Sequence, residues 1–125
     1  MTNALIASTS TVHGGGYLTY LLPELEVLFA QTDTILFIPF ARAGGLSHAD
    51  YTAKVAHAFA QINKKVVGLH EFDSYQQAIE QATGIFTGGG NTFLLVKQLH
   101  DHNLMSVLQT VIQSGTPYLG TSAGS

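Results

Sequence analysis

Apolar residues along the chain fall into two kinds of segment, short continuous runs and longer stretches with helical spacing. The continuous runs lie at residues 4–7, 34–38, 65–69, 85–86 and 116–119. Such runs are typical of strands that are covered on both faces. Between them, apolar side chains recur every three or four residues, as at Leu104, Val107, Leu108 and Val111. That spacing predicts helices that bury one face.

Helical spacing covers residues 18–29, 51–62, 75–82, 93–99 and 104–112, and local signals mark where helices and strands end. Ser47, and either Asp73 or Ser74, can cap the second and third helices, because their side-chain oxygens accept hydrogen bonds from first-turn N–H groups. Pro23 indicates that the first helix begins near it or bends there. Pro39 ends the second strand.

Strands that alternate with helices predict βαβ units with right-handed crossovers. We therefore expect one α/β domain over residues 1–125, with a mainly parallel, doubly wound sheet and helices on both faces. Ligands of such sheets bind beyond the carboxyl ends of the strands. The loop at residues 39–45 and two glycine-rich segments follow strands and should lie at that edge.

The second glycine-rich segment, Gly120-Thr121-Ser122-Ala123-Gly124, fits the G-x-S-x-G pattern of a nucleophile elbow. A serine that stands proud at a strand end occupies a sharp, strained turn, and only small residues fit on either side of it. A helix that follows would point its N-terminus at the serine and favour developing negative charge there. Ser122 is therefore the candidate nucleophile.

The first glycine-rich segment, Gly88-Gly89-Gly90-Asn91-Thr92, follows a short strand and precedes a helix. Glycines at a strand end can turn backbone N–H groups toward one point, which is how an oxyanion hole is built. We expect the N–H groups of Gly88 or Gly89, together with that of Ala123, to hold the oxyanion. The segment is also a strand-to-helix turn that Asn91 or Thr92 caps.

These motifs give the chain its resemblance to the peptidase E (aspartyl dipeptidase) family of serine peptidases, whose fold is similar to that of class I glutamine amidotransferases. Four stretches match in order: the first strand into Ser8-Thr9-Ser10, Phe37-Ile38-Pro39-Phe40-Ala41, Gly88 to Phe93, and Gly120 to Gly124. The resemblance covers the whole chain and implies hydrolysis of dipeptides with an N-terminal aspartate. Thr121 stands where relatives often carry an aromatic residue, and Ser125 where alanine is common, which affects substrate preference more than chemistry.

A serine nucleophile needs a base, normally a histidine that a carboxylate orients. In the family resembled, the base histidine and its acidic partner lie beyond the elbow, so we expect both beyond residue 125. The sequence stops three residues after Ser122, without the helix that should follow an elbow, and we expect this piece alone to be inactive. His13 follows the first strand and could face the site. His100 and His102 lie between two helices, which should place them at the opposite edge of the sheet.

Composition narrows the possible classes of protein. Apolar residues make up 46% of the chain and charged residues 10%, so disorder is not expected. The net charge of −3 offers no basic surface for nucleic acid. The absence of cysteine excludes disulfides and the cysteine nucleophile of amidotransferases. We expect a cytoplasmic enzyme that acts on small peptides, with no cofactor, metal, nucleic-acid or membrane partner; the sequence does not indicate its oligomeric state.

Two alternative functions remain open at this stage. A cyanophycinase-like relative would cleave bonds between aspartate and arginine, and a non-catalytic α/β domain would bind a small anion at the glycine loop. Arg42 follows the second strand and could pair with a substrate carboxylate, although a solvated surface role is favoured. His100, Asp101 and His102 could suggest a metal site, but ligands at such short spacing rarely converge on one ion, so a solvated loop is favoured.

Overall fold

A computed structural model describes residues 4–7, 22–40, 47–88 and 92–121. The strands are β1 (Ala4–Ala7), β2 (Thr34–Ile38), β3 (Lys65–Gly68), β4 (Ile85–Thr87) and β5 (Tyr118–Thr121). The helices are α1 (Leu22–Leu28), α2 (His48–Ala60), the 3₁₀ turn η3 (Leu69–Glu71), α3 (Tyr75–Gln81), α4 (Thr92–Asp101) and α5 (Met105–Gln113). None of these helices has the length and apolar character needed to cross a bilayer.

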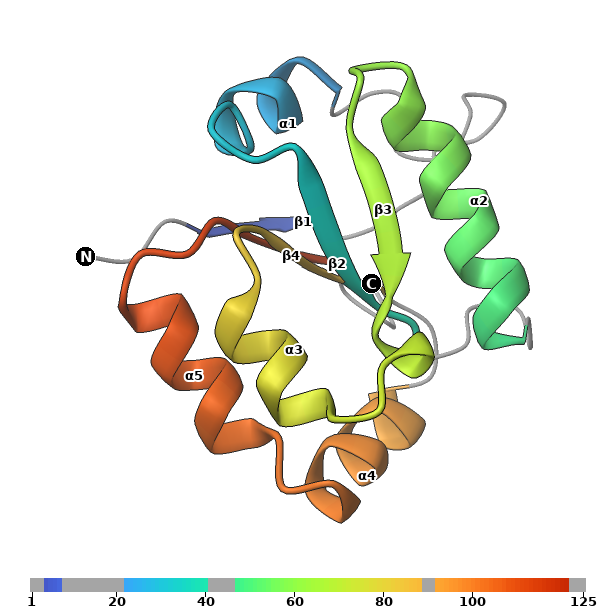
Figure 1. Ribbon diagram of the computed structural model, residues 1–125, viewed down its shortest axis with the longest axis vertical. Coiled ribbons are helices and arrows are strands. Elements are labelled where there is room, and N and C mark those ends of the chain that lie inside the picture. The colour runs from blue at the N-terminus through green and yellow to red at the C-terminus, as the bar shows by residue number, and fades with distance from the viewer. Residues whose placement is uncertain (1–3, 8–21, 41–46, 89–91, 122–125) are drawn as a thin grey trace.

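The five described strands form one sheet in the order β1-β5-β4-β2-β3, and every neighbouring pair is parallel. This arrangement confirms the parallel sheet predicted from the alternation of strands and helices. Strands β4 and β5, which lead into the two glycine-rich segments, are direct neighbours inside the sheet. Figure 1 shows the helices arranged around this central sheet.

The sheet separates two apolar cores, and successive side chains of a strand point into different ones. On one face, Ile35 and Phe37 of β2 pack with residues of α1 and α2. On the other, Leu36 and Ile38 pack with residues of α3, α4 and α5. Helices therefore cover both faces of the sheet, as predicted (Figure 1).

Most of the predicted helix caps and proline boundaries are confirmed. The side chain of Ser47 accepts a hydrogen bond from the Asp50 N–H (3.1 Å), and that of Ser74 accepts one from the Gln77 N–H (3.2 Å). Helix α1 begins one residue before Pro23, where the missing proline N–H costs no helical hydrogen bond. Strand β2 ends immediately before Pro39.

Three strand boundaries differ from the prediction. Strand β4 ends at Thr87 and not at residue 86. Strand β3 ends at Gly68 and not at residue 69, because the Glu71 carboxylate accepts the Gly68 N–H (3.0 Å) and closes the turn η3. Strand β5 covers Tyr118–Thr121 and not residues 116–119. Gly120 and Thr121, read from the sequence as the start of the elbow, pair with β1 at Ile6 and Ala7. Pairing with strands on both sides outweighs the weak strand preference of glycine.

Candidate active site

The ends of β4 and β5 lie side by side at the carboxyl edge of the sheet. Thr87, the last residue of β4, is in register with Gly120 and also with Ile38 at the end of β2. Adjacent strands are about 4.8 Å apart, so the first glycine-rich segment and the elbow start from neighbouring positions. Of the predicted site residues, Gly88 is described, whereas Arg42, Gly89, Ser122 and Ala123 lie outside the described residues.

The backbone N–H of Gly88 is already used within the sheet. It donates a hydrogen bond to the carbonyl of Ile38 (3.2 Å), which continues the pairing of β4 with β2 by one residue. A backbone N–H engaged in this way does not point at a substrate. Of the two glycines predicted as oxyanion donors, Gly88 therefore uses its N–H to anchor the start of the loop to β2.

Gly88 is also closely surrounded by side chains of the first core. A Cβ atom at this position would lie 2.5 Å from the Tyr51 hydroxyl and 2.8 Å from the Phe37 ring, so no other residue fits without a shift. Tyr51 and Phe37 are fully buried and meet edge to face, with ring centroids 4.8 Å apart. An aromatic pair thus fills the space beside the first residue of the glycine loop.

Two polar side chains lie on the other face of the same strand ends. Thr87 is buried, and its hydroxyl oxygen has no hydrogen-bond partner within the described part of the chain. The Tyr118 hydroxyl lies near Thr87, but the contact does not reach hydrogen-bond geometry. Burial raises the pKa of Tyr118 above its ordinary value, and the nearby Thr87 side chain only partly offsets this effect. Tyr118 is therefore a neutral phenol at ordinary pH.

Two histidines contact Phe40, which follows β2, and a third contacts one of them. The Phe40 ring centroid lies 5.5 Å from that of His48 and 6.2 Å from that of His102, and His48 lies 5.6 Å from His70. The expectation that His102 lies at the opposite edge of the sheet is wrong. Strand β5 is parallel to β4, so α5 must lead to the amino edge and begins at the carboxyl side, where the turn between α4 and α5 therefore lies.

The cluster around Phe40 is displaced from the elbow strand. It lies beyond β2 and β3, and the strand order puts β4 between β2 and β5. Two strand spacings correspond to about 10 Å, so Phe40 and the end of β5 lie at separate positions along the carboxyl edge. His57 on α2 and His100 on α4 are exposed. His13 lies outside the described residues.

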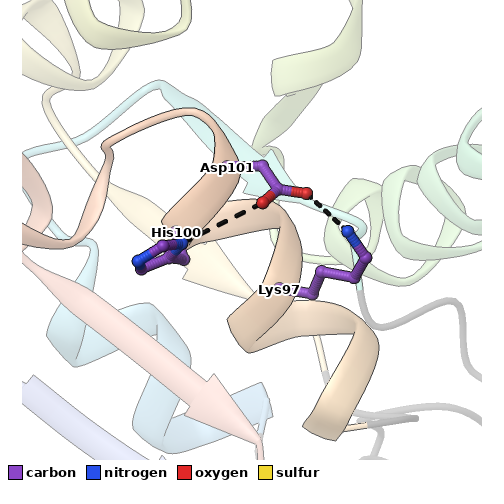
Figure 2. Close-up of polar contacts among 3 residues, drawn as sticks. All are labelled: Lys97, His100 and Asp101. Atoms are coloured by element: carbon purple, nitrogen blue, oxygen red, sulfur yellow. Dashed lines mark hydrogen bonds and ion pairs between the residues drawn. The ribbon is translucent and has the colours of Figure 1, made fainter.

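Asp101 is engaged in an ion pair on the surface of α4. Its carboxylate lies 2.8 Å from the Lys97 ammonium group and 4.0 Å from Nδ1 of His100 (Figure 2). The hydrogen bond from Lys97 lowers the pKa of Asp101 below its ordinary value. No group of three or more potential metal ligands occurs within residues 4–7, 22–40, 47–88 and 92–121. The short His-Asp-His stretch thus forms part of a solvated helix end.

Comparison with known proteins assigns the chain to a family. The model of Peptidase family S51 matches residues 4–125, and the chain belongs to that family. A Drosophila melanogaster protein named "Probable alpha-aspartyl dipeptidase" is 42% identical over 125 residues, which cover 98% of this chain and 51% of the relative. A Pasteurella multocida protein named Peptidase E is 38% identical over 126 residues, covering 99% and 53%. The resemblance noted from the motifs is confirmed.

Solved structures show the same fold. The crystal structure of a peptidase from an acI-B1 Actinobacterium superposes with a TM-score of 0.73 at 18% identity, over 97% of this chain and 54% of that one. The chain spans about half the length of the curated relatives it matches. The α/β fold is therefore shared with that peptidase despite low sequence identity.

Sequence patterns did not reveal the side chains that surround the glycine loop. Tyr51 lies on the buried face of its helix, so its spacing with Val55 indicated only core packing. Its position beside Gly88 depends on how α2 crosses the sheet, which periodicity does not encode. The sequence indicated Tyr118 only as a strand residue and Thr87 only as part of the glycine-rich stretch, and no local signal marked their proximity.

Proposed function

We propose that the protein containing this chain is a serine peptidase that hydrolyses dipeptides with an N-terminal aspartate. The carrying observation is the register of β4 with β5, which starts the glycine loop and the elbow from neighbouring strands. Membership of Peptidase family S51 and the names of the relatives support the substrate class. The cytoplasmic location expected from the sequence remains part of this proposal.

The proposed reaction proceeds through an acyl-enzyme. The Ser122 hydroxyl attacks the peptide carbonyl carbon while a base takes its proton, and the carbonyl oxygen becomes an oxyanion. The backbone N–H groups of Gly89 and Ala123 would stabilise that charge. Gly89 is preferred over Gly88, because the Gly88 N–H is donated to Ile38. Protonation of the leaving amine breaks the C–N bond, and water then releases the acid.

The base is proposed to be a histidine outside residues 1–125. The cluster of His48, His70 and His102 lies next to Phe40, which follows β2, and β4 separates β2 from β5 in the sheet. Residues 1–125 alone are therefore expected to lack the histidine that acts as base, and to show no turnover. Arg42 is retained only as a possible partner of a substrate carboxylate.

Replacement of the nucleophile tests the proposal in the complete protein. Ser122→Ala should abolish hydrolysis of Asp-Leu, because no other group can form the acyl-enzyme, while circular dichroism and thermal unfolding remain those of the parent. Loss of about 10⁴-fold or more in kcat is expected by analogy with other serine hydrolases. Retained turnover by the variant would reject Ser122 as nucleophile.

A substrate comparison separates the dipeptidase from the cyanophycinase-like alternative. Rates of hydrolysis of Asp-Leu and of β-Asp-Arg are measured with the same preparation, with Ser122→Ala as the blank. Preference for Asp-Leu supports the dipeptidase proposal, and preference for β-Asp-Arg supports the alternative. Labelling by a serine-directed phosphonate, lost in Ser122→Ala, distinguishes both from a non-catalytic anion-binding domain.

A further inference from the structure

A depression at the carboxyl edge of the sheet lies between the start of α3 and the turn that joins α4 to α5. Its volume is about 520 Å³, within the range of about 300–1,000 Å³ that is usual for small-molecule sites. Phe72, Tyr75 and His102 line it together with polar side chains. We propose that this depression binds the side chain of the second residue of the substrate dipeptide and selects for an aromatic one. The inference rests on the proposed function.

The rings that line the depression are held by a buried ring beside them. Tyr75 and His102 meet edge to face, with ring centroids 4.9 Å apart. The centroid of the buried Phe40 ring lies 5.8 Å from that of Tyr75 and 6.2 Å from that of His102. Phe72 is 40% exposed at the rim. A ligand ring can therefore contact preformed aromatic surface, and such ring pairs contribute to binding beyond the apolar area that they bury.

The charge of the depression separates the two residues of the dipeptide. Asp73 lines it and is exposed, so its carboxylate opposes the binding of a second carboxylate. No lysine or arginine is among the described residues that line it. The depression therefore does not suit the aspartate side chain of the substrate, and the side chain of the residue that leaves is the remaining occupant.

The depression lies within reach of a dipeptide that is cleaved at the end of β5. Phe40 follows β2, and β4 separates β2 from β5, so the two positions are about 10 Å apart. An extended peptide spans about 3.5 Å per residue, and an aromatic side chain lengthens this reach. Ligands of parallel sheets bind along this same edge. The leaving residue can thus place its side chain in the depression while the peptide bond lies at the elbow strand.

Hydrolysis of Asp-Phe and of Asp-Ala by the complete protein tests the assignment. We expect kcat/KM to be about 10-fold higher for Asp-Phe, because burial and ring contacts stabilise the bound phenylalanine side chain. His102→Ala removes one lining ring from an exposed position, so the fold should be kept and the ratio of the two values should fall about 3-fold or more.

His100→Ala is the matched control for this substitution. It deletes another imidazole two residues earlier, with a side chain that is 86% exposed and does not line the depression. The ratio of kcat/KM values should therefore remain that of the parent. Phe72→Ala, at the exposed rim, should lower the ratio as His102→Ala does, and it replaces His102→Ala if that protein does not fold.

Binding without turnover is measured in the complete protein that carries Ser122→Ala. Calorimetric titration should give a Kd for Asp-Phe about 10-fold below that for Asp-Ala. Addition of His102→Ala should reduce this difference, and addition of His100→Ala should not. This measurement does not depend on an acyl-enzyme, whereas hydrolysis retained by Ser122→Ala would reject the proposed function itself.

The selectivity for the second residue decides the assignment. A fall of the Asp-Phe to Asp-Ala ratio in His102→Ala, with no change in His100→Ala, supports an aromatic-selective site. Equal values for the two dipeptides in the parent, equal effects of the two histidine substitutions, or tighter binding of Asp-Lys than of Asp-Phe would overturn it.

Discussion

At the scale of single residues, Gly68 shows how a strand end can be restricted to glycine without unusual backbone angles. Its φ of −85° is open to any residue. The restriction comes from its surroundings: a Cβ atom would lie 2.4 Å from Cε1 of His70 and 2.9 Å from the Thr52 hydroxyl. The turn η3 folds His70 back over Gly68, and the Glu71 carboxylate holds that turn through the Gly68 N–H.

Gly68→Ala should therefore destabilise the fold through steric overlap. We expect a loss of about 1–3 kcal/mol in the free energy of unfolding, the usual cost of forcing extra volume into a packed site. Urea unfolding measures it. His70→Ala removes the nearest atoms, so the alanine at residue 68 should cost less in the double variant. Equal costs in both backgrounds would show that His70 is not the obstacle.

At the scale of elements, helix caps were predictable because they are encoded locally. Ser47 stands immediately before a helical pattern, and its side chain accepts the Asp50 N–H as that position requires. Helix α2 contributes Tyr51, Val55 and Phe59 to the first core. The helix therefore covers a large part of one face of the sheet.

Loss of this cap gives a direct test. Ser47→Ala leaves a first-turn N–H without its side-chain acceptor, and we expect the free energy of unfolding to fall by about 1 kcal/mol. Ser106→Ala in the exposed first turn of α5 is the matched control, with an expected change near zero. Thermal and urea unfolding of both variants provide the comparison. Equal effects of the two substitutions would contradict the capping role.

The order of elements followed from the sequence, whereas their exact limits and neighbours did not. Buried runs such as residues 34–38 encode a strand through their own composition. The end of β5 was misplaced because Gly120 has little strand preference, and both Gly120 and Thr121 are held by pairing with β1. The position of His102 at the carboxyl edge was missed because only the parallel pairing of β4 with β5 requires α5 to begin there. Both errors concern contacts between segments distant in sequence.

For the candidate site, the sequence predicted the two glycine-rich motifs but not the contacts that surround Gly88. Gly88 was grouped with Gly89 as a donor, since both precede a helix and neither carries a side chain. The hydrogen bond from Gly88 to Ile38 separates them, and it depends on β2 lying beside β4. The Tyr51 hydroxyl beside Gly88 likewise depends on tertiary packing.

At the scale of the whole molecule, one sheet is shared by two cores. Ile35 and Ile85 are both fully buried, on β2 and β4, but Ile35 belongs to the first core and Ile85 to the second. Because the same strands carry both cores, loss of packing on one face should weaken the other. The domain should then unfold as a single unit.

Ile35→Val and Ile85→Val test this coupling with the same chemical change on each face. Each should lower the free energy of unfolding by about 0.5–1.5 kcal/mol, the usual cost of removing one buried methylene. Both should shift one common transition, observed by tyrosine fluorescence and by circular dichroism during urea unfolding. Separate transitions for the two probes in either variant would indicate that the two faces unfold independently.

The strand order has a consequence for how the polypeptide matures. During synthesis, β2, β3 and β4 emerge within one stretch and can pair with each other, since β2 lies between the other two. Strand β1 emerges first, yet in the described sheet its neighbour is β5, the last described strand to leave the ribosome. Strand β1 therefore cannot form its hydrogen bonds with β5 until β5 has been synthesised, and pairing between segments so distant in sequence is slow. Of the described strands, the one made first is thus the last to gain its partner in the sheet.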